Sequence, residues 1–238
     1  IYGKMKKKKL YELWGGDIFN NPICDYTIGI DSIEKMVAKM KERPWPIYKI
    51  KVGTADDIAI VRALRKNTEA TLRVDANAAW DVDTALKLIP QLKELGVELV
   101  EQPLAKDDWE GMKILYQKSS LPLYADESCV SEKDVEKCQN HFHGINIKLT
   151  KCSGITPAKR MIEKAKQLGM KVMIGCMNES TIGSAAIAHL LPFIDHVDMD
   201  GPLLLEEDLA TGIEYEYGKI NYSDAPGLEI KYTGLFKK

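Results

Sequence analysis

TLRVD at residues 71–75, VELVE at 97–101 and LPLYAD at 121–126 are short apolar runs that each end in an acidic residue. The three acids, Asp75, Glu101 and Asp126, recur at a nearly constant interval. An interval of about 25 residues accommodates one strand, one crossover helix and two short loops. Because the carboxyl ends of parallel strands lie at one edge of a sheet, the three acidic side chains are expected to converge.

One similar apolar run precedes these three segments and another follows them, and each of the two ends in a lysine. YKIK ends at Lys51 and GINIK ends at Lys148, each at a similar interval from the nearest of the three acids. The same spacing therefore continues over five successive strands. Two lysines and three carboxylates are predicted to share one end of the sheet.

Strand-like and helix-like segments alternate along most of the chain. Asp31 and Thr54 are predicted to cap the first two helices. Strict alternation of eight strands with seven helices implies a parallel sheet, and eight strands close most simply as a barrel. The predicted fold is α/β, a TIM-like (β/α) barrel. Its expected strands cover residues 23–30, 47–52, 71–75, 97–101, 121–126, 144–148, 170–176 and 193–200.

Composition excludes several classes of partner. The 238 residues include 33 basic and 35 acidic ones, for a net charge of −2. This balance predicts no binding to nucleic acid or to an anionic membrane. No apolar run approaches the roughly 20 residues needed to span a bilayer, and no signal-peptide pattern opens the chain. Five scattered cysteines without CxxC spacing indicate free thiols and a cytoplasmic location.

The two ends do not fit a self-contained barrel. Residues 1–20 read as the remnant of a helix and a linker from a missing N-terminal capping domain. The catalytic barrel is expected at 21–210. Residues 211–238 alternate like antiparallel strands and contain a Pro-Gly turn, so this tail is expected to pair with the capping domain.

Three carboxylates at one rim predict a magnesium site. Asp75, Glu101 and Asp126 supply hard oxygen ligands, and Mg²⁺ usually keeps open positions for water or substrate. The alternative is that each acid caps the helix after its strand. Three acids at matched positions, flanked by strand-end lysines, favour the metal.

A lysine on each side of such a site suggests acid–base chemistry. A metal bound to a substrate carboxylate would stabilise the enediolate that forms when the neighbouring α-proton is removed. Lys49 shares a strand face with Lys51, and a second cation favours neutral lysine. Lys51 and Lys148 lie on strands two and six, across an eight-stranded barrel. They are therefore placed to act on opposite faces of one carbon, although either could also be an exposed strand-end charge.

These residues resemble a known family. The chain is similar to the enolase superfamily, within it to the muconate lactonising enzyme subgroup, and most of all to dipeptide epimerases of the L-Ala-D/L-Glu type. Enzymes of this superfamily combine lysine or histidine bases with Mg²⁺. The resemblance extends over almost the whole chain and rests on KIKVG (49–53), VDANAAW (74–80), VEQPL (100–104), ADES (125–128) and NIKLTKCSGI (146–155).

The resemblance implies a role for each site residue. It makes the barrel one of the β7α7β type, the three acids Mg²⁺ ligands, and Lys51 and Lys148 the catalytic pair. It gives Lys49 a supporting, substrate-contacting role. Members of this family are often homo-oligomers, and the sequence itself leaves the oligomeric state open.

The assignment to dipeptide epimerases in particular depends on residues outside the motifs quoted above. HVDMDGP (196–202) resembles the segment with which dipeptide epimerases hold the substrate ammonium group. Asp198 and Asp200 share one strand face, so both carboxylates can meet one cation; otherwise they are an acidic pair that ends a strand. The resemblance also places Thr27 and Cys176 against the dipeptide, with a buried structural cysteine as the alternative for Cys176.

The predicted function is Mg²⁺-dependent epimerisation of a dipeptide at the α-carbon of its C-terminal residue, by two-lysine 1,1-proton transfer through an enediolate. One alternative is another enzyme of the subgroup, a cycloisomerase or an o-succinylbenzoate synthase, which has no ammonium group to hold. A second is a catalytically idle barrel used for binding. Which dipeptide is preferred does not follow from the sequence.

Overall fold

The computed structural model describes residues 1–234. Within that range, eight strands form one sheet in the order β1 to β8, and every neighbouring pair in it is parallel. The strands are β1 (Tyr26–Ile28), β2 (Ile47–Lys51), β3 (Thr71–Asp75), β4 (Val97–Glu101), β5 (Leu123–Ala125), β6 (Gly144–Lys148), β7 (Lys171–Gly175) and β8 (His196–Asp198).

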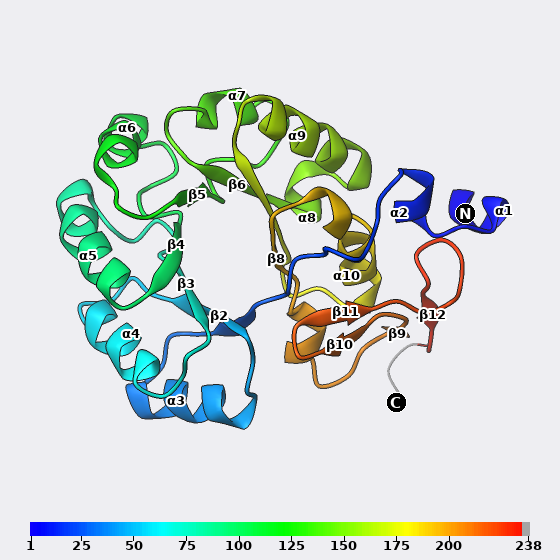
Figure 1. Cartoon of the computed structure of the whole chain (residues 1–238), viewed down its shortest axis with the longest axis horizontal. Coiled ribbons are helices and arrows are strands. Elements are labelled where there is room, and N and C mark those ends of the chain that lie inside the picture. The colour runs from blue at the N-terminus through cyan, green and yellow to red at the C-terminus, as the bar shows by residue number, and fades with distance from the viewer. Residues whose placement is uncertain (235–238) are drawn as a thin grey trace.

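The sheet closes into a barrel at the seam between β1 and β8. A parallel bridge joins Cys24 to Val197, and the Asp25 N–H donates to the Val197 carbonyl at 3.3 Å. At least one helix joins each strand to the next up to β8, and the connection from β6 to β7 has a short additional helix, so the predicted β7α7β barrel is confirmed (Figure 1).

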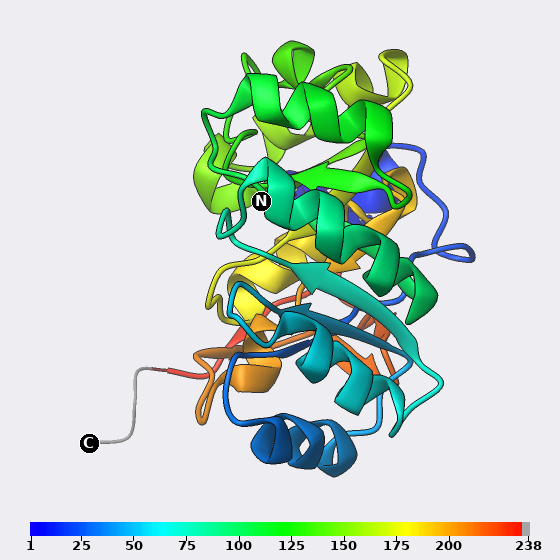
Figure 2. The ribbon, with the colours of Figure 1, turned by 90° about the vertical axis from the view of Figure 1, so that its left-hand side faces the viewer.

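Helices cover the outside of the strands, as Figure 2 shows for the face that carries α3 to α6. Their apolar faces meet the outward-facing strand residues in one continuous core. The helices between strands are α3 (Ile33–Glu42), α4 (Asp57–Arg65), α5 (Val82–Glu94), α6 (Trp109–Lys118), α7 (Val135–Cys138), α8 (Leu149–Cys152), α9 (Ile155–Gln167) and α10 (Thr181–Ala188).

The predicted helix caps were wrong, because nearby polar groups compete for the same donors. The cap of α3 is Ser32, whose hydroxyl accepts from the Lys35 N–H at 3.4 Å, while Asp31 binds the Ser32 N–H and the Lys35 ammonium. The cap position of α4 is Asp56. Thr54 instead donates its N–H and its hydroxyl to Asp57.

A bulge in β4 sets which side chains point into the barrel. Val97 pairs with Leu72, but Val100 pairs with Val74, so two residues of β4 oppose the single residue Arg73. Without this extra residue, Val97 and Glu101 would share a face. With it, Val97 packs outward and Glu101 lies beside Asp75 inside the barrel.

The remaining helices, turns and strands are not part of the eight-stranded sheet. They are α1 (Tyr2–Lys6), α2 (Leu10–Leu13), the 3₁₀ turns η1 (Leu191–Phe193) and η2 (Gly201–Leu204), and strands β9 (Ala210–Thr211), β10 (Glu214–Glu216), β11 (Lys219–Asn221) and β12 (Lys231–Tyr232).

The C-terminal tail forms antiparallel pairs, as predicted. β10 pairs with β11, and β12 pairs with β9. Figure 1 shows the tail beside the N-terminal helices, where Lys9 bridges to Gly227. The last four residues of the predicted tail lie outside the described range, and the division of the chain into domains remains a prediction. No helix in the described range is both long and apolar enough to cross a membrane.

Candidate active site

Three acids lie between two lysines around one end of the barrel. Asp75, Glu101 and Lys148 close β3, β4 and β6, and Asp126 follows β5 directly. Asp75 and Glu101 are neighbours in the parallel ladder, as are Lys51 and Asp75. The predicted convergence of these strand ends is therefore present, and the three acids are at most 1% exposed.

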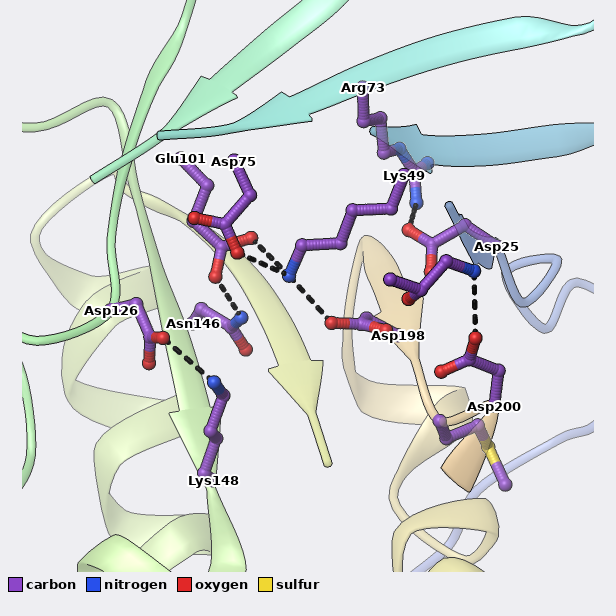
Figure 3. Close-up of polar contacts among 12 residues, drawn as sticks. Asp25, Lys49, Arg73, Asp75, Glu101, Asp126, Asn146, Lys148, Asp198 and Asp200 are labelled. Atoms are coloured by element: carbon purple, nitrogen blue, oxygen red, sulfur yellow. Dashed lines mark hydrogen bonds and ion pairs between the residues drawn. The ribbon is translucent and has the colours of Figure 1, made fainter. Parts of the chain in front are cut away.

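Lys49 is the centre of this cluster. Its Nζ lies 2.6 Å from Asp198 Oδ2, 2.7 Å from Glu101 Oε2 and 3.2 Å from Asp75 Oδ2 (Figure 3). Burial lowers the pKa of the Lys49 ammonium, but attraction by the three carboxylates outweighs burial and raises the pKa well above its usual value. The surrounding carboxylates therefore favour the charged form of the buried Lys49 side chain.

The two lysines predicted to be catalytic are each bound to one of the predicted metal ligands. Lys51 Nζ donates to Asp75 Oδ2 at 2.7 Å, and Lys148 Nζ donates to Asp126 Oδ2 at 2.7 Å. Burial lowers the pKa of Lys148, but Asp126 outweighs burial and raises it. The pairing with Asp126 therefore favours the protonated form of Lys148.

The three predicted ligands form a set of hard donors that suits a dication. Burial and then repulsion from Asp75 raise the pKa of Glu101 to about 7, and Lys49 only partly opposes this. Glu101 Oε2 is buried and has an ion-pair contact to Lys49 but no well-directed hydrogen bond. Such a carboxylate gains most from an added positive charge, as Mg²⁺ would supply. The assignment of Asp75, Glu101 and Asp126 as metal ligands remains a prediction, because each of them is paired with a lysine here.

Asp198 closes β8, Asp200 follows it, and the two carboxylates lie close together. Among the described residues, the one group of three potential metal-binding side chains whose ligand atoms lie within 4.8 Å of one another is Cys176, Asp198 and Asp200. Asp200 Oδ2 accepts from the Thr27 N–H at 2.7 Å. Burial and then Asp198 raise the pKa of Asp200 to about 6.

A cavity of about 510 Å³ connects these groups. Its lining includes all the predicted catalytic and substrate-binding residues, namely Thr27, Lys49, Lys51, Lys148, Cys176, Asp198 and Asp200. A larger groove of about 730 Å³ lies beside α3, outside the barrel, and contains none of the predicted catalytic or metal-binding residues. The cavity inside the barrel is therefore the candidate active site.

Several polar residues of this site were not predicted from the sequence. Asn146 donates to Glu101 Oε1 at 2.7 Å, and Lys151 donates to Asp126 Oδ1 at 2.8 Å. Asn77 accepts from Lys51 at 3.0 Å. Strand alternation could have identified Asn146, which lies two positions before Lys148 and so shares its face.

Comparison with known proteins agrees with this geometry. The family described as enolase C-terminal domain-like matches residues 32–233. An L-Ala-D/L-amino acid epimerase from Flavobacterium johnsoniae is 58% identical over 230 residues, which are 97% of this chain and 68% of that protein.

Two solved structures share the fold. An L-Ala-D/L-Glu epimerase from Bacillus subtilis, in a substrate-liganded complex, matches with a TM-score of 0.92 and 33% identity over 98% of this chain and 69% of that one. A dipeptide epimerase from Cytophaga hutchinsonii, complexed with Mg and D-Ala-L-Val, matches with a TM-score of 0.92 and 32% identity over 99% and 68%. The chain thus spans about two thirds of the length of these relatives.

Proposed function

The chain belongs to the family of enolase C-terminal domain-like proteins, and on that premise we propose that it forms the catalytic barrel of a Mg²⁺-dependent dipeptide epimerase. The reaction would invert the α-carbon of the C-terminal residue. One observation carries the proposal. Lys51 and Lys148, from β2 and β6, line the same cavity from opposite sides of the barrel.

Asp75, Glu101 and Asp126 would hold the Mg²⁺, which when bound would make the α-proton more acidic by stabilising negative charge on the substrate carboxylate. Side chains of the protein would carry out the proton transfers and hold the site in place. Lys51 would remove or return a proton on one face of the α-carbon, and Lys148 would do so on the other. Lys49 would fix the carboxylates that surround the reacting group.

Asp198 and Asp200 support a substrate with a free amino terminus. Within residues 1–234, Asp200 has a backbone N–H as partner and no lysine or arginine within ion-pair distance, although it is 2% exposed. A substrate ammonium group would supply the missing charge. This observation disfavours a cycloisomerase or an o-succinylbenzoate synthase, and the intact set of lysines and acids disfavours an idle barrel.

The two-base mechanism can be tested by proton exchange in the full-length enzyme. Lys51→Ala and Lys148→Ala should each abolish epimerisation, because inversion needs one proton removed and another delivered. Each variant should still exchange the α-proton of the one epimer whose proton faces the remaining lysine. NMR in D₂O with the L,L and L,D dipeptides separately measures this. Exchange of the same epimer by both variants, or epimerisation at the wild-type rate by either, would contradict the assignment.

The ammonium assignment has a separate test. Asp200→Asn should reduce kcat/KM strongly for a free dipeptide and little for its N-acetylated form. An equal loss on both would show that the acidic pair is structural.

A further inference from the structure

The residue after Glu101 has a side chain whose hydrogen-bonding groups are all used within the protein. Gln102 is fully buried. Its Oε1 accepts from the Asp126 N–H at 3.0 Å and from the Ser128 N–H at 3.1 Å. Its Nε2 donates to the Leu104 carbonyl at 2.8 Å and to the Ser128 hydroxyl at 2.9 Å. An amide side chain has two acceptor lone pairs and two donor hydrogens, so all four positions are filled.

The main chain of Gln102 connects segments from three neighbouring strands. Its N–H donates to the Tyr124 carbonyl of β5 at 2.8 Å, and its carbonyl accepts from the Ala78 N–H at 2.8 Å. Ala78 lies in the loop that follows Asp75 at the end of β3. The segments that carry the three candidate metal ligands are therefore joined at one residue.

The backbone of Gln102 has a conformation that its own side chain and the next residue disfavour. Its φ is 33°, in the left-handed region, and Pro103 follows it. Residues with a side chain rarely adopt a positive φ, and a following proline restricts the backbone before it to extended conformations. Such a conformation persists only where surrounding contacts enforce it, and it is found most often at functional sites. The hydrogen bonds of Gln102 supply these contacts.

The sheet itself does not fix the position of Asp126. β5 ends at Ala125, which is the last residue of this strand to pair with a neighbouring strand. The Asp126 N–H donates to the Gln102 side chain instead of continuing the ladder. Glu101 is the last residue of β4 and pairs with β5. Asp126 is therefore placed relative to Glu101 by the side chain of the residue next to Glu101.

The lysines that contact Asp126 cannot take over this task once a dication is bound. The Asp126 carboxylate accepts from Lys148 and from Lys151, and Figure 3 shows the contact with Lys148. A dication at the acids would repel both ammonium groups. The contact between the Gln102 amide and the Asp126 main chain has no net charge, so a dication would not repel it in this way.

We propose that Gln102 is a positioning residue for the candidate magnesium site, because it sets the placement of Asp126 against Glu101 and so determines how tightly the acids bind the dication. The inference rests on the proposed function, since it takes Asp75, Glu101 and Asp126 as the metal ligands. Gln102 is absent from the cavity lining, so it does not touch the substrate there. Removing a group that holds metal ligands in place typically lowers metal affinity by about 10–100-fold.

The test compares Gln102→Met with Tyr48→Phe in the full-length enzyme. Methionine is unbranched and of similar length, but it removes all four hydrogen bonds of the amide. Tyr48 is also buried, and its hydroxyl accepts from the Trp45 N–H and donates to the carbonyl groups of Met40 and Arg43. None of these partners is a candidate metal ligand. Tyr48→Phe is therefore a matched control for the loss of buried hydrogen bonds elsewhere in the barrel.

Mg²⁺ binding is measured by isothermal titration calorimetry on metal-free protein, without substrate. Gln102→Met should raise the Kd for Mg²⁺ by about 10–100-fold. Tyr48→Phe should change it by less than about twofold, because it lies apart from the acids. Epimerisation rates at increasing Mg²⁺ give a second readout. For Gln102→Met the half-maximal Mg²⁺ concentration should rise with the Kd, and saturating Mg²⁺ should restore most of kcat. A merely structural role would lower kcat at every Mg²⁺ concentration.

An unchanged Kd in Gln102→Met, or an equal rise in Tyr48→Phe, would overturn the inference. A kcat that stays low at saturating Mg²⁺ would overturn it as well. If Gln102→Met does not fold, Ser128→Ala takes its place, because it removes one partner of the Gln102 amide. Ser128→Ala should raise the Kd about threefold, the effect of one lost hydrogen bond, and an unchanged Kd would again overturn the inference.

The same titration separates this inference from the function on which it rests. A wild-type enzyme that binds no Mg²⁺ would refute the magnesium site of the proposed function itself. Wild-type binding with an unaffected Gln102→Met variant would refute only the role of Gln102.

Discussion

Replacing Lys49 with Met should destabilise the protein far more than the same change at Lys51. Both lysines lie on β2 and face the barrel interior, so the substitution is matched in chemistry and strand. Lys49 is 2% exposed in its side chain and contacts three carboxylates, whereas Lys51 is 27% exposed and forms an ion pair with Asp75.

The size of the expected loss of stability depends on which polar partners each carboxylate retains in the variant. Without Lys49, Asp75 keeps Lys51 and Glu101 keeps the Asn146 amide, but the Asp198 side chain loses its cation. Breaking a buried ion pair from one side costs about 3–5 kcal/mol. Lys51→Met should cost about 1 kcal/mol, as expected for a partly exposed pair. The free energy of unfolding should therefore differ between the variants by about 2–4 kcal/mol.

The difference should also depend on pH through Glu101. The pKa of Glu101 in the folded protein is about 7, above its ordinary 4.5, mainly because of burial. An acid whose pKa is raised by folding binds more protons in the folded state than in the unfolded state. The free energy of unfolding therefore falls as the pH rises through this window. Removing Lys49 raises the pKa of Glu101 further and extends this loss to higher pH. The cost of Lys49→Met should therefore be larger at about pH 8 than at about pH 5.5.

Urea unfolding of the full-length protein measures both effects, in the presence of a chelator so that no dication replaces the missing charge. At about pH 8 the midpoint for Lys49→Met should lie about 1–2 M below that of the wild type, given the denaturant dependence usual for proteins of this size. Equal midpoints for the two variants would refute the central role of Lys49. A cost independent of pH would refute the role given to Glu101.

Three further outcomes are expected. Gly175→Ala should lower activity, because the added Cβ would lie 2.7 Å from the Asn146 side chain, which donates a hydrogen bond to Glu101. Gly29→Ala is the control, because Gly29 has open space around it. Equal kcat/KM values for the two variants would contradict the packing argument. Burial lowers the pKa of His189 from 6.5 to about 4, so the stability that neutral His189 contributes is complete above pH 6.5 and is lost as the pH falls towards 4. His189→Gln should therefore make the urea midpoint depend less on pH over this range. An unchanged pH dependence of the midpoint would argue against this role of His189. Chelation should abolish dipeptide epimerisation and added Mg²⁺ should restore it, whereas full activity with excess chelator would exclude the metal role.

Spacing along the sequence was sufficient to predict the barrel and to bring the candidate site residues to one end of it. Parallel strands separated by one helix must place their carboxyl ends together, so the spacing alone assigns Asp75, Glu101, Asp126 and the lysines to one rim. Strand alternation also placed Asp198 and Asp200 on one face.

Only the tertiary structure decided which charges meet. Lys49 could not be identified as the partner of three carboxylates, because they come from β3, β4 and β8 and approach one another only when the barrel closes. The bulge in β4 and the pairing of Asp25 with Arg73 were equally hidden. Alternation along a strand is a local property of the backbone, whereas register shifts and buried ion pairs depend on how distant strands pack around the shared interior.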